Sequence, residues 1–347
     1  MKNSFITYYE DESKKLNEYI SEFNKKLIIT DNTFLKDNLE AFANLNFGGK
    51  LIRGTLINLG YSLLKDNRTY SYPLATAFEV FQTSILIHDD IIDKDEKRRG
   101  KDTIHSLIDS KYNDSHLGNS VAICMGDYGF YSSMKMISEN YKDDDNLSKI
   151  ISYFSDVVLK TIEGELLDVI TPFKEIKKLD NSNLKQDIMD IYKLKTAYYT
   201  ITGPLSLGLL LGGLEQEKLD SINKFGYNVG VAFQLQDDLL GIYSDSTGKI
   251  SGSDIKEFKT TMLYAYTKDN KKFYDELLTV YGRDVNDDVL KKTREIFELS
   301  GAKGYVEHLI EKFYSEAISI VQNIDWLSDE KRDILIDFVK YLKERKK

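Results

Sequence analysis

The sequence predicts an all-α protein built as one domain. Only 3 prolines occur among 347 residues, and 41% of the residues are hydrophobic while 30% are charged, a balance typical of amphipathic helices around a core. Apolar residues recur at helical spacing along most of the chain, and no strand-like alternation of useful length is present. Because there is also no repeat or low-complexity linker, we assign residues 1–347 to a single domain.

The helices are expected where apolar residues recur every three or four positions. They lie over residues 4–29, 33–45, from Gly54 to about 64, 73–93, 120–140, 147–169, 183–212 and 216–243, with further helical patterns from 255 to 347. Pro73 suits the first turn of its helix. The charged stretch 95–100 and the Ser- and Gly-rich stretch 245–254 are interpreted as loops.

Composition also excludes several classes of function. The 47 basic and 56 acidic residues give a net charge of −9, which argues against general nucleic-acid binding because that needs a basic face. The single cysteine, Cys124, rules out an internal disulfide framework, and its apolar neighbours predict that it is buried. There is no signal-peptide core, and the apolar segment 205–214 is too short to span a bilayer. We therefore expect a cytoplasmic protein without a transmembrane segment.

The sequence Gly-Gly-Lys-Leu-Ile-Arg-Gly at residues 48–54 precedes the third expected helix. Its paired glycines allow a tight turn where a helix begins, and helix N-termini favour anions. Lys50 and Arg53 are three residues apart and can point the same way. The motif fits a diphosphate site, and it equally fits a helix start with two solvated cations.

The helix over 73–93 ends in acid. Asp89 and Asp93 are four residues apart, so they share a helix face, where a divalent cation would offset their repulsion. Carboxylates and water are ligands that Mg²⁺ prefers, usually completed by substrate phosphates. Arg98 and Arg99 follow. Adjacent helical side chains diverge by about 100°, so this pair suits two different anions, although it could also be a surface charge cluster.

A second acidic pair, Asp237-Asp238, ends the apolar helix over 216–243. Either pair alone is explained by a solvated helix end. Two such pairs on helices apolar enough to be buried are harder to explain, because buried carboxylates without partners are costly. We therefore expect two helices that face each other across a cavity, with metal ions between them.

Other cations fall near these motifs. Lys195-Thr196 precedes a glycine-rich stretch, Lys249 lies in the loop after the second acidic pair, and Lys259 lies beyond it. Each fits a phosphate site, and each also fits an ordinary solvated cation. Asp168 could likewise be a capping acid or part of the site.

Together these residues resemble the trans-isoprenyl diphosphate synthases, or polyprenyl synthetases, and are most similar to a geranylgeranyl diphosphate synthase. Five signatures occur in the order typical of that family. They are Gly-Gly-Lys-x-x-Arg-Gly at 48–54, Asp-Asp-x-x-Asp with Arg-Arg-Gly at 89–100, Gly-Asp at 126–127, Lys-Thr at 195–196, and Phe-Gln-x-Gln-Asp-Asp at 233–238 followed by Gly-Lys at 248–249.

The resemblance implies antiparallel helices around a deep central cavity, the isoprenoid synthase fold, usually as a homodimer. It also implies a head-to-tail, trans prenyl transfer. Two or three Mg²⁺ ions bind the diphosphate of an allylic substrate, whose C–O bond ionises to a carbocation. Isopentenyl diphosphate attacks this cation and then loses a proton, for which the released diphosphate is the usual acceptor. Metal and protein cations stabilise the charge on the leaving diphosphate.

The resemblance also assigns roles to residues at matching positions. Asp89, Asp93 and Asp237 match metal ligands, with Asp90 and Asp238 as supporting acids. The residues that match the allylic diphosphate site are Arg98, Lys195, Lys249 and, more loosely, Lys259. Those that match the isopentenyl diphosphate site are Lys50, Arg53, Gln82 and Arg99. Thr196 and Gln234, with Lys195, match groups beside the reacting carbons.

The chain departs from the family pattern in two places. Gly241 stands where many members carry a third aspartate, and Asp245, four residues later, could reach a metal through water. Gly164-Glu165-Leu166-Leu167-Asp168 stands where relatives often have Gly-Gln-x-x-Asp. The second departure affects the local polar contacts and leaves the chemistry unchanged.

Product length is expected to be set by three residues that precede the first acidic motif on its helix: Phe81, Ser84 and Ile85. A bulky residue five positions before the first Asp resembles the floor that stops growth at fifteen carbons, and here that position is Ser84, followed by Ile85. Phe81 lies three residues deeper, a rise of about 4.5 Å, close to one isoprene unit. We hypothesise that Phe81 is the floor and that the product has twenty carbons. Alternatively, Phe81 is plain core and the floor lies elsewhere.

Other functions remain as alternatives. The enzyme could make farnesyl or longer polyprenyl diphosphates. A terpene cyclase is disfavoured, because it would need neither the Gly-Gly-Lys-x-x-Arg motif nor the Arg-Arg-Gly pair. A non-catalytic subunit of a heteromeric synthase typically loses acids from one motif, whereas both pairs are present here.

Overall fold

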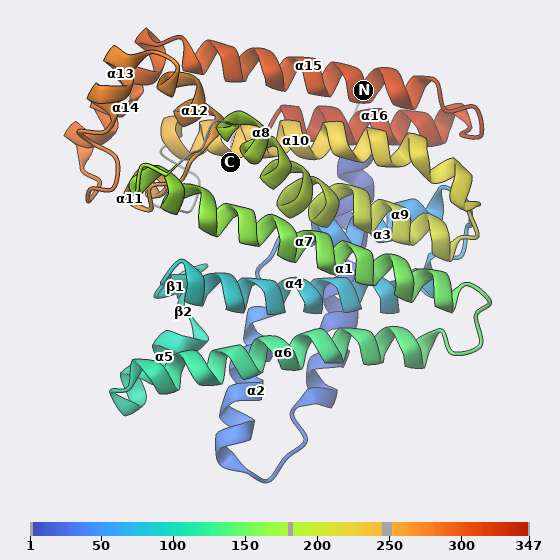
Figure 1. Cartoon of the computed structure of the whole chain (residues 1–347). Helices are drawn as coiled ribbons and strands as arrows, with labels where there is room; N and C mark the ends of the chain where they lie inside the picture. Colours follow the sequence, from blue (N-terminus) through green and yellow to red (C-terminus); the bar gives the residue numbers. More distant parts are fainter. Residues whose placement is uncertain (1–2, 180–182, 245–251, 346–347) are drawn as a thin grey trace. The chain divides into compact units, whose positions relative to one another are not determined.

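A computed structural model describes residues 3–179, 183–244 and 252–345. These residues form helices and one two-stranded hairpin, which confirms the all-α prediction (Figure 1). The chain divides into two compact units. The N-terminal unit comprises Ile6–Phe154 and Pro204–Gln216, and the C-terminal unit comprises the described parts of Met1–Phe5, Ser155–Gly203 and Glu217–Lys347. One domain over 1–347 stays a prediction.

The N-terminal unit contains the first acidic motif. Its elements are α1 (Ser4–Leu27), α2 (Thr33–Leu45), α3 (Ile52–Ser62), the 3₁₀ turn Arg68–Ser71, α4 (Tyr72–Ile92), β1 (Lys97–Arg98), β2 (Lys101–Asp102), α5 (Ile104–Tyr112), α6 (Ser115–Asn140), the start of α7 (Leu147–Ile176), and α9 (Gly203–Leu211). Its core between α2, α4, α5 and α6 includes Phe42, Val80, Ile87, Ile104, Ala122 and Met125.

Glycines let helices of this unit approach closely. Helices α4 and α6 run side by side (Figure 1). A Cβ atom at Gly126 would lie 2.2 Å from His88 Nε2, and one at Gly129 would lie 2.1 Å from Ser84 Oγ. Such distances exclude a larger residue at either position unless the neighbouring side chains or the helices move. Gly126 and Gly129 therefore permit the close approach of His88 and Ser84 of α4 to α6.

The C-terminal unit contains the second acidic motif. Its elements are the rest of α7, α8 (Leu184–Ile191), the π-helix Tyr192–Thr202, the 3₁₀ turn Gln216–Lys218, α10 (Leu219–Tyr243), α11 (Ser253–Lys256), α12 (Met262–Lys268), α13 (Lys271–Leu277), α14 (Asp287–Leu299), α15 (Ala302–Gln322) and α16 (Asp329–Lys343). Helix α10 packs against the π-helix, where a Cβ atom at Gly230 would lie 2.3 Å from Ala197 Cα. This contact places the acidic end of α10 beside Lys195-Thr196.

The observed elements differ clearly from the expected ones in four places. Helix α5 and the β1–β2 hairpin were not expected, and helix α6 begins at Ser115 and not at residue 120. Helix α7 continues through Pro172 to Ile176, and residues 183–212 form α8, the π-helix and α9 in succession. Short elements carry too few residues for periodicity to reveal them. By contrast, α2 has the expected bounds, and α4 is shifted by one residue from 73–93.

The prediction that Cys124 is buried is wrong, because its side chain is exposed. The buried face of α6 is formed by small residues and methionine, Gly118, Ala122, Met125, Gly126 and Gly129 among them. Cys124 falls on the opposite face of the same apolar run. In the described part of the chain, no helix combines the length and apolarity needed to cross a membrane.

Candidate functional site

Asp89 and Asp93 lie at the C-terminal end of α4, where the backbone N–H of Asp93 donates to the Asp89 carbonyl over 2.8 Å. Both acids are partly exposed. Among the described residues, no group of three or more His, Cys, Asp or Glu side chains is close enough to hold a metal alone. Two carboxylates with open positions nevertheless fit Mg²⁺, which keeps several waters and binds substrate phosphates.

Asp90 is buried and holds Arg98. It is 1% exposed, and Arg98 donates from Nε to its Oδ1 and from Nη2 to Asp95 Oδ2 over 3.4 Å. Burial raises the pKa of the Asp90 carboxyl to about 6, although the Arg98 charge acts in the opposite direction. Asp90 therefore fixes the guanidinium group of a predicted diphosphate ligand.

Arg98 and Arg99 diverge, as predicted, but the expected reason is wrong. They lie on a hairpin and not on a helix, with Arg98 in β1 and Arg99 in the turn at φ +53°. While Arg98 contacts Asp90, Arg99 donates from Nη1 to the carbonyls of Leu45 and Phe47 over 3.3 and 2.8 Å. The turn backbone, and not a helical 100° step, sends the two side chains to different partners.

The glycine loop before α3 meets Arg99. A Cβ atom at Gly49 would lie 3.0 Å from Arg99 Nη2, so the guanidinium group rests on this glycine. Lys50 is exposed, and its carbonyl accepts a hydrogen bond from Tyr9 over 2.6 Å. Arg53 is partly buried in the first turn of α3. The structure thus brings Arg99 to the Gly-Gly-Lys-x-x-Arg motif, about 50 residues earlier in the chain.

The second acidic motif is part of a hydrogen-bonded chain in the C-terminal unit. Thr196 Oγ1 donates to Gln234 Oε1 over 2.7 Å, and Gln234 Nε2 donates to Asp238 Oδ1 over 2.7 Å. Tyr192 donates to Asp238 Oδ2 and accepts from the backbone N–H of Met262 over 3.0 Å. These contacts link the predicted residues Thr196, Gln234 and Asp238 and add Tyr192 to them.

Burial raises the pKa of the Asp238 carboxyl to about 7. An unfolded aspartate has a pKa of about 3.9, so the folded state holds this proton where the unfolded state releases it. The stability that Asp238 contributes is therefore fully present below about pH 4 and is lost as the pH rises through about 7.

An Asp238→Asn variant tests this dependence in metal-free protein. The substitution removes the titration, so we expect the melting temperature of the variant relative to the parent to rise between pH 5 and pH 8. Thermal unfolding monitored by circular dichroism measures both proteins at each pH. An unchanged difference would contradict the raised pKa.

Lys195 is paired with two acids of α7. Its Nζ atom lies 2.6 Å from Glu165 Oε2 and 2.6 Å from Asp168 Oδ2. A Cβ atom at Gly164 would lie 2.4 Å from the Lys195 backbone nitrogen, so glycine permits this close approach. Asp168, for which the sequence left a capping role or a place in the site open, is an ion-pair partner of the predicted allylic diphosphate ligand.

Asp237 is paired with the C-terminal segment of the chain. Arg345 forms an ion pair with Asp237 Oδ1, and its guanidinium carbon lies 4.4 Å from the centre of the Phe233 ring. Gln236 Nε2 donates to the Lys343 and Arg345 carbonyls over 3.3 and 3.0 Å, which holds this segment on α10. Burial lowers the pKa of Arg345 to about 10. A predicted metal ligand is therefore neutralised by a protein cation.

Arg345 should compete with metal for Asp237. A partly exposed ion pair is worth up to about 1 kcal/mol, so Arg345→Gln is expected to tighten Mg²⁺ binding by up to about fivefold. Calorimetric titration of metal-free protein with Mg²⁺ measures this affinity. Lys343→Gln is the matched control, because Lys343 pairs with Glu311 over 2.6 Å and should leave Mg²⁺ affinity unchanged. Equal affinities in the parent and Arg345→Gln would contradict the competition.

Three further residues singled out in the sequence lie after α10. Lys259 pairs with Glu257 over 3.1 Å and is partly buried. Lys249 and Asp245 lie outside the described residues.

The three residues expected to set product length occupy different surroundings on α4. Phe81 is fully buried, with its ring centroid 5.3 Å from those of Phe130 and Phe154. Ser84 is fully buried against Gly129 and donates to the Val80 carbonyl over 3.1 Å, whereas Ile85 is partly exposed. Contact with α6 is thus an independent reason for a small residue at position 84.

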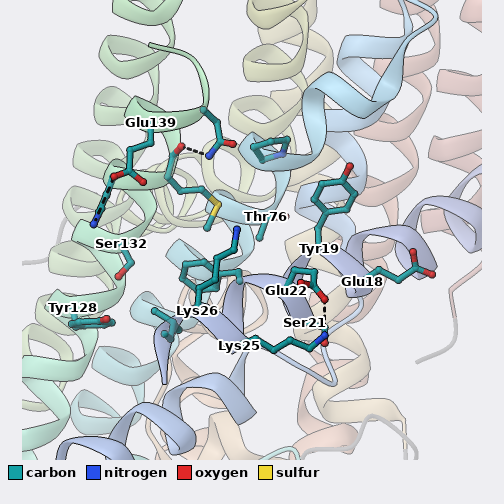
Figure 2. A pocket seen from close by; sticks show the side chains of 16 residues that line it. Glu18, Tyr19, Ser21, Glu22, Lys25, Lys26, Thr76, Tyr128, Ser132 and Glu139 are labelled. Atoms are coloured by element: carbon teal, nitrogen blue, oxygen red, sulfur yellow. Dashed lines mark hydrogen bonds and ion pairs between the residues drawn. The ribbon is translucent and has the colours of Figure 1, made fainter. Parts of the chain in front are cut away.

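Figure 2 shows a pocket of about 1020 Å³ in the N-terminal unit. Its walls include Glu18, Lys25 and Lys26 of α1 and Ser132 and Glu139 of α6. As far as the described residues go, its lining contains none of the predicted site residues. The chemistry predicted from the motifs is therefore not assigned to this pocket.

The structure also identifies partners that sequence patterns did not. Glu79 accepts a hydrogen bond from the Gly54 backbone, Tyr192 binds Asp238, and Arg345 binds Asp237. Glu79 carried one detectable signal, an acid within the apolar run Ala-Phe-Glu-Val-Phe. For Tyr192 and Arg345 no local pattern points to the distant partner.

Comparisons with known proteins identify the family of the chain. The sequence model of the family described as Polyprenyl synthetase matches residues 36–298. Geranylfarnesyl diphosphate synthase of Aeropyrum pernix is 28% identical over 309 residues, which cover 86% of this chain and 91% of that protein. Geranylgeranyl diphosphate synthase of Sulfolobus acidocaldarius is 29% identical over 307 residues, 86% of each chain.

A solved structure shares the fold over nearly the whole length. It is geranylgeranyl pyrophosphate synthase from Corynebacterium glutamicum in complex with isoprenyl diphosphate and magnesium. The TM-score is 0.85 at 26% identity, and the match covers 97% of this chain and 98% of that one.

Proposed function

The chain belongs to the polyprenyl synthetase family, and from this premise we propose that it makes geranylgeranyl diphosphate from isopentenyl diphosphate and an allylic diphosphate. The enzyme is a trans-prenyltransferase of isoprenoid biosynthesis. The observation that carries the proposal is the pair of acidic motifs together with two arginines held in different directions by Asp90 and by the glycine loop.

In the N-terminal unit we assign two tasks. Asp89 and Asp93 bind metal, and Arg98, oriented by Asp90, binds the allylic diphosphate. The residues assigned to isopentenyl diphosphate are Lys50, Arg53, Gln82 and Arg99. Contact of Arg99 with the Phe47 carbonyl and Gly49 supports this second group, because it draws cations to the start of α3, where backbone N–H groups favour an anion.

In the C-terminal unit Asp237 and Asp238 serve the metal, with Asp238 held by Tyr192 and Gln234. Lys195, Lys249 and Lys259 bind the allylic diphosphate. Thr196 and Gln234 lie beside the reacting carbons, and their mutual hydrogen bond fixes the direction of both side chains. When bound, two or three Mg²⁺ ions would neutralise charge on the leaving diphosphate.

We propose that growth stops at twenty carbons and that Phe81 is the floor. The fully buried aromatic cluster around Phe81 supports this, since a rigid wall is needed to block a growing chain. The matching relatives are named for products of different length, twenty carbons in one case and twenty-five in another. The experiment therefore also distinguishes farnesyl and longer products. The homodimer remains a prediction from the family resemblance, and the cytoplasmic location remains a prediction from the sequence.

Incorporation of labelled isopentenyl diphosphate tests the reaction. The purified protein is incubated with Mg²⁺ and dimethylallyl, geranyl or farnesyl diphosphate, and butanol-extractable label is counted. We expect extractable label only when Mg²⁺ and both diphosphates are present, with EDTA as the metal-removal control.

The other outcomes separate the competing functions. Hydrocarbons formed from an allylic diphosphate alone would indicate a cyclase. Absence of any product from folded protein would indicate a non-catalytic subunit.

A further inference from the structure

Glu79 is a buried acid in an apolar stretch of α4. Its side chain is 5% exposed between the core residues Phe78 and Val80. Burial raises the pKa of its carboxyl group, while a hydrogen bond from Gly54 and the charges of Arg53 and Arg99 act in the opposite direction. A buried acid is costly unless it is paired, so the partners of Glu79 indicate what keeps it there.

The first partner is the N-terminus of α3. Glu79 Oε1 accepts a hydrogen bond from the Gly54 backbone N–H over 2.8 Å. Gly54 is the third residue of α3, and the first four N–H groups of a helix have no partner within it. Leu51, at the N-cap with φ +50°, provides no side-chain cap. Glu79 therefore caps α3 from a neighbouring helix.

The position of Gly54 makes this contact close. A Cβ atom there would lie 2.4 Å from Leu16 Cδ2 and 3.2 Å from Glu79 Cγ. Any other residue would displace Leu16 of α1 and press on α4. The glycine that ends the Gly-Gly-Lys-x-x-Arg-Gly motif thus lets the first turn of α3 pack closely against Leu16 and Glu79.

The other partners are two arginines. Arg53 directly precedes Gly54, and Arg99 lies across Gly49 with Nη1 on the carbonyls of Leu45 and Phe47. The charges of both guanidinium groups lower the pKa of the Glu79 carboxyl. One buried acid therefore caps the first turn of α3, which carries Arg53, beside the glycine loop on which Arg99 rests.

We propose that Glu79 is a positioning residue for the isopentenyl diphosphate site, an inference that rests on the proposed function. Its carboxylate caps the first turn of α3 and orients the guanidinium groups of Arg53 and Arg99 toward the diphosphate. The charge of Glu79 and its orienting effect predict opposite changes in the affinity for isopentenyl diphosphate. A negative charge beside two arginines weakens anion binding, whereas correct orientation of the arginines strengthens it.

Glu79→Gln distinguishes the two effects. The amide keeps the side-chain length and an oxygen acceptor for Gly54, but it loses the charge that orients the arginines. We expect the Kd for isopentenyl diphosphate, measured by calorimetry on the full-length protein without allylic substrate, to rise about tenfold. In steady-state assays the KM for isopentenyl diphosphate should rise similarly, while kcat and the allylic KM stay within about twofold.

Thr76→Val is the matched control. Thr76 is 2% exposed on the same helix, one turn before Glu79, and is assigned no role in either substrate site. The control should leave both KM values unchanged. Its comparison with Glu79→Gln separates loss of the carboxylate from general disturbance of α4.

Three results would overturn the proposal. Unchanged binding of isopentenyl diphosphate in Glu79→Gln would show that the carboxylate does not position the arginines, and tighter binding would show that its charge alone matters. Parallel weakening of both substrates with a lower melting temperature would indicate a purely structural role. A parent protein that binds no isopentenyl diphosphate would instead contradict the proposed function.

Discussion

Replacing Asp89 with asparagine is expected to lower kcat by about 10²- to 10³-fold, the typical loss when one preorganised electrostatic group is removed from an active site. The amide keeps the shape of the side chain but loses the negative charge that would bind Mg²⁺. Because Asp89 is partly exposed at the end of α4, the melting temperature should stay close to that of the parent. Steady-state assays over a range of Mg²⁺ concentrations measure the loss and show whether excess metal restores activity.

Asp102→Asn is the control for this prediction. Asp102 is an exposed acid in β2, a few residues after the acidic motif. Its backbone lies opposite that of Lys97 in the hairpin. Its replacement should leave kcat within about twofold, since surface substitutions away from a site have small effects. Similar activity in the Asp89→Asn and parent proteins would contradict a catalytic role for the first acidic motif.

Shortening Phe81 to alanine is expected to change product length and to cost about 3–5 kcal/mol of stability, the usual range for a phenylalanine removed from a core. Phe81 is fully buried against Phe78, Phe130 and Phe154, so its ring leaves a cavity. If Phe81 is the floor, a growing prenyl chain can enter that space. Chromatography of the dephosphorylated alcohols should then show products longer than twenty carbons.

Phe81→Leu keeps the test informative if the alanine variant unfolds, because the smaller loss of volume should still yield a fraction of longer alcohols. The matched control is Phe338→Leu. Phe338 is fully buried in the C-terminal unit against Phe5, with ring centroids 4.8 Å apart. This control should leave the product length unchanged. The same product length in the parent and both Phe81 variants would place the floor elsewhere.

Periodicity was sufficient to predict the long helices, because their apolar faces repeat over several turns. Helix α4 shows this most clearly, since its apolar run and first-turn proline gave its bounds to within one residue. The β1–β2 hairpin escaped prediction because its strands have two residues each. Helix α7 was predicted too short, at 147–169, whereas the structure carries it through Pro172 to Ile176.

Site residues could be predicted where they recur in local motifs, but their partners could not. The sequence identified Asp90 and Arg98 as candidates, yet only the folded chain pairs them. Position 84 shows the same limit. A small side chain there was interpreted through product length, whereas the structure adds its contact with Gly129. Such contacts depend on which helices meet, and a single sequence does not encode that in any local pattern.

The size of the product made by the purified protein tests the central claim most directly. Labelled isopentenyl diphosphate, Mg²⁺ and each allylic starter in turn are supplied, and the alcohols are sized after dephosphorylation. We predict a twenty-carbon alcohol as the end product from every starter that is accepted. Shorter or longer end products would support prenyltransferase activity but would contradict the proposal that Phe81 stops chain growth at twenty carbons. No chain elongation from any starter, in protein that remains folded, would contradict the proposed function itself.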